Sequence, residues 1–151
     1  MLEHIRNFYR ISDTIATSGQ PTAEQFKLIK KSGFNAVINL ALFDSPHAIK
    51  NEETIVKQAN MDYLHIPVDF KMPKNSDLEL FFDAMEKYSD KKLFIHCALN
   101  MRVSAFIFLY KIIKQQMPVQ KAIYDLHAVW IPDEVWQDFI ESSLMQHNIS
   151  N

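Results

Sequence analysis

Short apolar runs alternate along this chain with longer segments in which apolar residues recur every three or four positions. A short apolar run bounded by turn residues is typical of a buried strand, and the longer periodicity is typical of an amphipathic helix. The predicted strands are residues 8–15 (one strand or a strand pair), 36–40, 63–68 and 93–96. The predicted helices are residues 22–33, 52–60, 76–88, 102–115, 118–130 and 132–147.

Three of these helices carry recognisable start signals. Residues 22–25 and 76–79 have the spacing of a capping box, with Thr22 and Ser76 as the capping residues. Pro132 is expected near the first position of the last helix. The segment 102–115 is apolar on almost all sides, so it should be a central helix covered by its neighbours. Trp130 and Trp136 are expected to pack the last two helices together.

Strands separated by helices predict an α/β fold with a central, mostly parallel sheet of about four or five strands, flanked by helices on both faces. We expect residues 1–151 to form a single domain. Ligands of such sheets bind beyond the carboxyl ends of the strands. The loops after residues 40, 68 and 96 should therefore meet there, and Gln20 and Asn39, beside turns at that end, should satisfy buried backbone groups.

The segment His96-Cys97-Ala98-Leu99-Asn100-Met101-Arg102 joins a predicted strand to the central helix. Such a loop directs its N–H groups and the positive end of the helix dipole at one spot. The chain has a single cysteine, Cys97. The loop amides, the dipole and Arg102 would favour its thiolate and would also attract an oxyanion. Together they predict covalent catalysis on a phosphate-like group.

Arginine at a helix start opposes the helix dipole and is unfavourable without an anion, which favours a functional interpretation of Arg102. The other histidines lack metal-ligand spacing and no second cysteine exists, so no metal site is expected. Two glycines in the whole chain cannot form a glycine-rich nucleotide loop, and we expect no cofactor.

A formal net charge of −2 does not suggest binding to nucleic acid, and residues 103–110, the longest apolar stretch, are too short to span a membrane. A lone cysteine and the absence of a signal peptide fit a reducing compartment, so the expected location is cytoplasmic.

The His-Cys-loop-Arg segment resembles the cysteine-dependent protein phosphatases, especially the small dual-specificity type. Further blocks resemble the bacterial beta-lactamase-hydrolase-like phosphatase domain family, and the likeness covers residues 8–115. These blocks are Ser18-Gly19-Gln20-Pro21, residues 33–40 (GFNAVINL) and residues 63–68 (YLHIPV).

The resemblance implies a role for each residue of the loop. Cys97 would attack phosphorus and Arg102 would clamp two phosphoryl oxygens in a bidentate fork. The backbone N–H groups of Ala98, Leu99, Asn100, Met101 and Arg102 would bind the equatorial oxygens. His96 would orient the loop and help to keep the cysteine ionised.

Asp69, in the loop after the third predicted strand, would protonate the leaving oxygen and then activate water. Asp44, Asp77 and Asp83 are its rivals. The expected substrate is a phosphoprotein or a small phosphoester, and the oligomeric state stays open.

The loop departs from the usual phosphatase pattern in three ways. Four residues separate Cys97 from Arg102, whereas the usual loop has five. Asn100 stands where a glycine is common, and Asn tolerates a left-handed backbone. Val103 replaces the hydroxyl residue that eases departure of the thiolate, and Ser104 could supply that hydroxyl instead.

These departures leave two alternatives open. The shorter spacing also occurs in rhodanese-type sulfurtransferases. Taken together, the three departures would fit a phosphate-recognition or regulatory module that does not catalyse hydrolysis.

Overall fold

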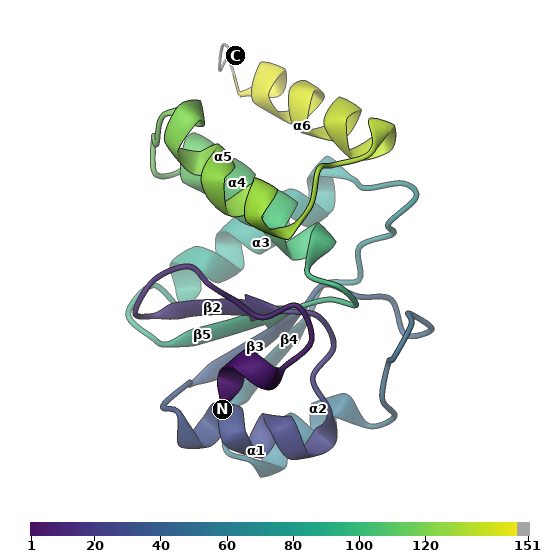
Figure 1. The fold of residues 1–151 in the computed structure, drawn as a ribbon, viewed down its shortest axis with the longest axis vertical. Helices are drawn as coiled ribbons and strands as arrows, with labels where there is room; N and C mark the ends of the chain where they lie inside the picture. Colours follow the sequence, from purple (N-terminus) through teal and green to yellow (C-terminus); the bar gives the residue numbers. More distant parts are fainter. Residues whose placement is uncertain (148–151) are drawn as a thin grey trace.

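The computed structural model describes residues 1–147, and over these residues the chain forms one five-stranded sheet in the order β1-β2-β5-β3-β4 (Figure 1). The strands are β1 (Tyr9–Arg10), β2 (Ile15–Ser18), β3 (Ala36–Asn39), β4 (Asp62–His65) and β5 (Leu93–His96). β1 pairs antiparallel with β2, and every other pairing is parallel. The predicted α/β fold with a mostly parallel sheet is therefore confirmed.

β5 lies in the middle of the sheet, between β2 and β3. In the register of the sheet, His96 stands opposite Ser18 of β2 on one side and opposite Asn39 of β3 on the other. All four residues of β5 are buried. The carboxyl end of β5 is thus held from both sides, and the loop that begins at Cys97 leaves the sheet from a fixed position.

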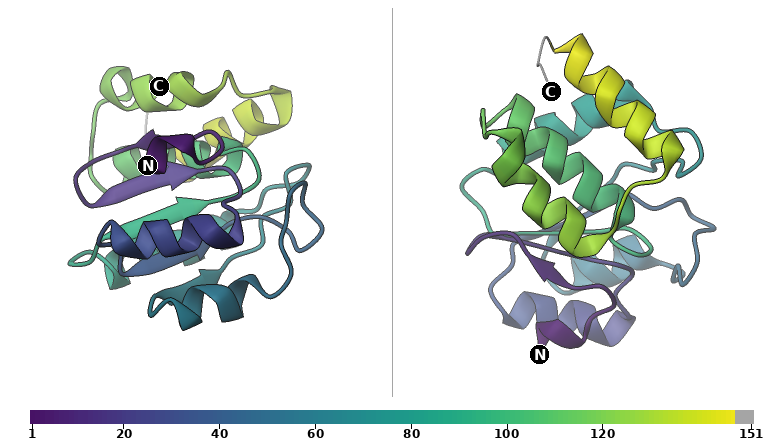
Figure 2. Two further views of the ribbon diagram at one scale, coloured as in Figure 1. Left: turned by 60° about the horizontal axis from the view of Figure 1, so that its bottom comes forward. Right: turned by 45° about the horizontal axis from the view of Figure 1, so that its top comes forward.

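Helices cover both faces of the sheet (Figures 1 and 2). One face carries the short 3-10 helix η1 (Leu2–His4), α1 (Ala23–Lys31) and α2 (Glu52–Gln58), with α1 and α2 side by side in the left view of Figure 2. The other face carries α3 (Asn75–Lys87), α4 (Met101–Ile113), α5 (Val119–Val129) and α6 (Glu134–Gln146). The loops after β3 and β4 extend on the right of Figure 1.

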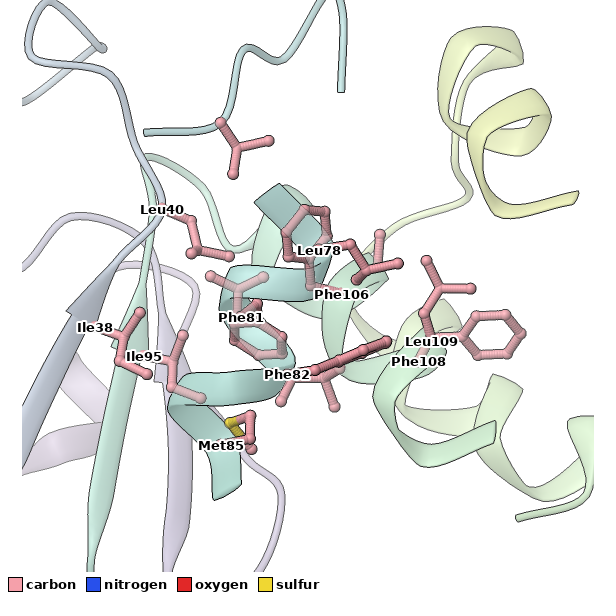
Figure 3. Close-up of a cluster of buried hydrophobic side chains, with 14 of the residues drawn as sticks. Ile38, Leu40, Leu78, Phe81, Phe82, Met85, Ile95, Phe106, Phe108 and Leu109 are labelled. Carbon is pink, nitrogen blue, oxygen red and sulfur yellow. The ribbon is translucent and has the colours of Figure 1, made fainter. Parts of the chain in front are cut away.

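The larger hydrophobic core lies between the sheet and α3 to α6. Ile38 and Ile95 of the sheet face Phe81 of α3 and Phe106 of α4 in this core (Figure 3). The ring centres of Phe81 and Phe106 are 5.5 Å apart and the ring planes meet at 65°, a favourable edge-to-face geometry. As its sequence predicts, α4 is buried on nearly every side. Its first turn, which directly follows the Cys97 loop, is therefore held in place by the packing of the helix.

The helix starts match the sequence predictions only in part. At α1, Thr22 and Gln25 form the predicted capping box. The prediction at Ser76 is wrong, because the chain is already helical at Asn75 and Ser76 lies inside the first turn. Pro132 lies close to the start of α6, as predicted, but outside the helix, whose first residue is Glu134. It precedes the N-cap Asp133, whose carboxylate accepts a hydrogen bond from the Trp136 N–H.

Among residues 1–147, the helices are too short or too polar to cross a lipid bilayer. Residues 148–151, the end of the predicted single domain, lie outside the described residues.

Candidate active site

The loop from Cys97 to Asn100 connects β5 to α4 and turns back sharply at its end. Asn100 has a φ of 67°, in the left-handed region that Asn tolerates better than most residues. It is the N-cap of α4, but its side chain caps no N–H of that helix. Asn100 thus supplies the turn that the sequence assigns to it, and its side chain is free for other contacts.

The Asn100 side chain ties the loop to the N-terminal part of the chain. Its Nδ2 donates to the carbonyl oxygen of Asn7 at 2.9 Å and to Oγ1 of Thr17 at 3.0 Å. On the other side of the loop, the Gln20 N–H donates to the carbonyl oxygen of Ala98 at 3.0 Å. The loop is therefore fastened to β2 and to the turn that follows β2.

Gly19 makes this close approach of two backbones possible. A Cβ atom built on Gly19 would lie 2.4 Å from the carbonyl oxygen of Ala98, a distance that two such atoms cannot adopt. The glycine of the Gly-Gln-Pro block is needed for space, because its own backbone has no positive φ.

The loop presents unpaired N–H groups at the start of α4. Among the described residues, the backbone N–H groups of residues 98, 99, 101 and 102 have no hydrogen-bond acceptor, whereas the Asn100 N–H belongs to the antiparallel bridge between Leu99 and Gly19. The first N–H groups of a helix are unpaired by geometry, and the helix dipole adds a partial positive charge there. These four groups are available to bind an anion beside Cys97.

Arg102 lies in the first turn of α4 and is only 5% exposed. Its Nη1 donates to the carbonyl oxygen of Val68 at 3.0 Å, while its buried Nε has no partner among the described residues. The guanidinium carbon is 5.8 Å from the centre of the Phe70 ring. The guanidinium is thus held in place with a donor unused, which suits it to bind an anion.

Cys97 and Arg102 open onto one cavity of about 600 Å³. Asp69 lines the same cavity, and its Oδ1 accepts a hydrogen bond from the Lys71 N–H at 2.9 Å. Asp44 lines it too, whereas Asp77 and Asp83 do not. The complete lining consists of Leu42, Asp44, Ser45, Pro46, Asp69, Phe70, Lys71, Cys97, Ala98, Leu99, Met101 and Arg102.

Asn100 and Ser104 do not line this cavity. The Ser104 hydroxyl donates to the carbonyl oxygen of Met101 at 2.9 Å. The side chain of Ser104 is therefore engaged with the backbone of the first turn of α4, and its suggested role in thiolate departure stays a prediction.

His96 lies behind the loop, fully buried. Its Nδ1 is 3.1 Å from the carbonyl oxygen of Cys97, and its Nε2 is 2.7 Å from Oε2 of Glu52. His96 therefore connects the Cys97 carbonyl oxygen to the Glu52 carboxyl group.

Glu52, at the start of α2, is buried and held by three side chains. Besides His96, Gln20 Nε2 donates to its Oε1 at 2.7 Å and the Tyr63 hydroxyl donates to its Oε2 at 3.0 Å. Burial acts to raise the pKa of the Glu52 carboxyl, but the charge of His96 and the three hydrogen bonds outweigh it, so the pKa lies below its ordinary value. The Glu52 carboxyl is therefore ionised near neutral pH and accepts hydrogen bonds from its neighbours.

Sequence reasoning missed Glu52 and Tyr63 altogether. An acidic residue in the first turn of a helix is ordinarily explained by the helix dipole and by exposure to solvent, and no local signal marks this one as buried. The prediction that Gln20 and Asn39 bond backbone groups near the turns is confirmed. Gln20 bonds the Pro21 carbonyl as well as Glu52, and Asn39 accepts from the Ala41 N–H at 2.8 Å.

The close approach at Gly19 generates a testable prediction. Gly19→Ala should shift the loop, weaken binding of inorganic vanadate by about tenfold or more and cost about 1–3 kcal/mol of unfolding free energy. Gly33→Ala is the control, because Gly33 has a φ of 97° and no crowded neighbour, so it should lose stability and keep vanadate affinity. Wild-type vanadate affinity in Gly19→Ala would contradict the steric account.

The buried contact between Glu52 and His96 generates a second prediction. A carboxyl whose pKa is lowered in the folded state contributes stability at any pH above its ordinary pKa of 4.5. That contribution is lost as the pH falls through the lowered pKa. Glu52→Gln should cost about 3 kcal/mol near neutral pH, and the difference from wild type should shrink in acid. Denaturant unfolding at several pH values measures the two unfolding free energies. A difference between variant and wild type that does not change with pH would refute a stabilising interaction between Glu52 and His96.

Comparisons with known proteins agree with this geometry. A structure from Shewanella putrefaciens CN-32, described as a candidate phosphatase (DUF442), is 34% identical over 97% of this chain and 96% of its own, with a TM-score of 0.86. P. aeruginosa TpbA in complex with pTyr has 16% identity over 95% of this chain and 91% of its own, with a TM-score of 0.70.

PTPMT1 in complex with PI(5)P has 15% identity over 94% of this chain and 97% of its own, with a TM-score of 0.78. At this low identity, the likeness to TpbA and PTPMT1 shows a shared fold. No curated protein matches the chain.

The family whose model matches is described as "DSP-PTPase phosphatase fused to NAD+ Kinase", and the match covers residues 10–143. This range runs from the end of β1 into α6 and contains β2 to α5 and the whole of the Cys97 loop. The chain therefore belongs to this family of dual-specificity-type phosphatases.

Proposed function

We propose that the chain is a cysteine-dependent phosphatase that hydrolyses phosphomonoesters through a cysteinyl-phosphate intermediate. The observation that carries this proposal is the single cavity onto which a cysteine, an arginine, an aspartate and the unpaired loop amides all open. A nucleophile, an oxyanion site and a proton donor are the three parts that such a reaction needs.

In the first step, the Cys97 thiolate attacks phosphorus and the bond between phosphorus and the leaving oxygen breaks. The leaving oxygen takes the proton of the Asp69 carboxyl, so the alcohol departs neutral. The phosphoryl group is then bound to Sγ. The loop amides and the unused Arg102 donor bind its oxygens as negative charge shifts between them.

In the second step, a water molecule attacks the phosphocysteine. Asp69, now a carboxylate, accepts a proton from that water, the bond between sulfur and phosphorus breaks, and Cys97 leaves as a thiolate. Inorganic phosphate departs and Asp69 is protonated again. The amides and the helix start that bound the substrate also stabilise this thiolate, so the same groups serve both steps.

The walls of the cavity favour a substrate with an apolar group next to its phosphate. Leu42, Pro46, Phe70, Leu99 and Met101 form much of the lining, and Leu99 is 37% exposed. TpbA in complex with pTyr offers a precedent for an aromatic phosphoester on this fold, and PTPMT1 in complex with PI(5)P offers one for a phosphorylated lipid headgroup. We infer a phosphorylated substrate, either a phosphoprotein or a small phosphoester.

Within the superfamily, the Gly-Gln-Pro block supports placing the chain with the bacterial beta-lactamase-hydrolase-like phosphatase domains. Gly19 and Gln20 both contact groups around the Cys97 loop, so the block has a role in the site. A second hydrophobic core lies on the other face of the sheet, and both cores include residues of β3 and β5, which supports one phosphatase domain over residues 1–151. The need to keep Cys97 reduced supports a cytoplasmic location.

The direct test of this function is hydrolysis of p-nitrophenyl phosphate between mildly acidic and neutral pH. Wild type should turn over with inhibition by vanadate, and Cys97→Ser should lose activity by at least about a thousandfold because the hydroxyl is a far weaker nucleophile than a thiolate. Unchanged turnover in Cys97→Ser would refute the mechanism. No turnover in fully reduced wild type would favour phosphate recognition without catalysis.

The two acids at the cavity allow a matched comparison. Asp69→Asn should lower kcat for phenyl phosphate by about a hundredfold or more, since this poor leaving group needs a proton, whereas Asp44→Asn should have a much smaller effect. Steady-state kinetics of the two variants measure this directly. A larger loss in Asp44→Asn would transfer the acid role to Asp44.

A further inference from the structure

Phe70, the neighbour of Asp69, packs against two tryptophans from the C-terminal part of the chain. Its ring centre is 5.8 Å from Trp130 and 5.9 Å from Trp136. The guanidinium of Arg102 lies 5.8 Å from the Phe70 ring centre. The loop after β4, which carries Asp69, runs beside the start of α6 in Figure 1 and in the right view of Figure 2.

Trp136 also holds the backbone of this loop. Its Nε1–H donates to the carbonyl oxygen of Phe70 at 2.8 Å. Trp136 is completely buried, with its ring centre 6.0 Å from that of Phe106 in α4 and 5.5 Å from that of Phe139 in α6. A fully packed indole has little freedom to move, so the hydrogen bond fixes the Phe70 carbonyl relative to α4.

The residue on the other side of Asp69 is fixed as well. Arg102 donates to the carbonyl oxygen of Val68 at 3.0 Å, and the Val68 N–H donates to the Leu40 carbonyl at 3.0 Å. The carbonyl groups of both neighbours of Asp69, Val68 and Phe70, are therefore bonded to side chains of α4 and α6. The carboxyl itself is exposed, and its Oδ1 accepts a hydrogen bond from the Lys71 N–H of the same loop, so its direction follows the loop backbone.

We propose that Trp136 is a positioning residue for the Asp69 carboxyl, because it bonds the Phe70 carbonyl and so holds the acid at the cavity. The inference rests on the proposed phosphatase function and adds a role for α6. General acid catalysis requires the carboxyl to lie within hydrogen-bond reach of the leaving oxygen. A shift of about 1 Å in the loop is enough to impair proton transfer strongly.

The test compares two substrates whose leaving groups differ in their need for a proton. Trp136→Phe keeps an aromatic ring and removes the hydrogen bond to Phe70. It should lower kcat for phenyl phosphate, which needs the proton, by about tenfold or more, and lower kcat for difluoromethylumbelliferyl phosphate, which barely needs it, by less than about twofold. In an Asp69→Asn background the same substitution should cause no further loss on phenyl phosphate.

Trp130→Phe is the matched control. Trp130 flanks the same Phe70 ring, but its buried Nε1 has no partner among the described residues, so the substitution removes no bond to the loop. It should leave the ratio of the two kcat values at the wild-type level. Equal losses on both substrates in Trp136→Phe, or a normal ratio, would overturn the inference.

A second variant covers the case in which Trp136→Phe does not fold. Phe70→Leu loosens the loop from both Trp136 and Arg102 at a side chain that is only half buried, so kcat for phenyl phosphate should fall further than kcat for difluoromethylumbelliferyl phosphate. Equal losses on both substrates would contradict the inference. Failure of the phosphatase mechanism is separate, since it appears as full hydrolysis by Cys97→Ser.

Discussion

The close contact between the Cys97 loop and the turn after β2 is the interaction on which the candidate site depends. Gly19 lets two backbones approach, the Gln20 N–H bonds the Ala98 carbonyl, and Asn100 bonds Asn7 and Thr17. These contacts hold a loop of only four residues between Cys97 and Arg102 in a shape that leaves most of its N–H groups unpaired. Without these contacts, the loop would not be held in the shape that directs those N–H groups at one spot.

The charges around Cys97 divide into two groups with different roles. Behind the loop, the Glu52 carboxyl bonds Nε2 of His96, and Nδ1 of His96 lies 3.1 Å from the Cys97 carbonyl oxygen, so this buried pair supports the loop from the side away from the cavity. In front of the loop, Arg102 and the start of α4 provide positive charge that no described carboxylate pairs. The field that favours an anion therefore comes from the cavity side.

Most of the fold could be predicted from the sequence, and the sequence also pointed to the Cys97 loop as the candidate site. Alternating strands and helices predicted the parallel sheet, and the apolar character of α4 predicted its burial. Local patterns could not reveal contacts between distant segments. Glu52 looks like an ordinary first-turn acid, and Trp136 looks like an ordinary packing residue. Their partners His96 and Phe70 are 44 and 66 residues away.

The central claim is that Cys97 carries the phosphoryl group during the reaction. The most direct measurement is acid-quench mass spectrometry of Asp69→Asn mixed with difluoromethylumbelliferyl phosphate, since this leaving group departs without the acid while release of the intermediate is slowed. The account predicts a protein heavier by one phosphoryl group, located on the peptide that contains Cys97. A phosphoryl group on another residue, or turnover with Cys97 never modified, would contradict it.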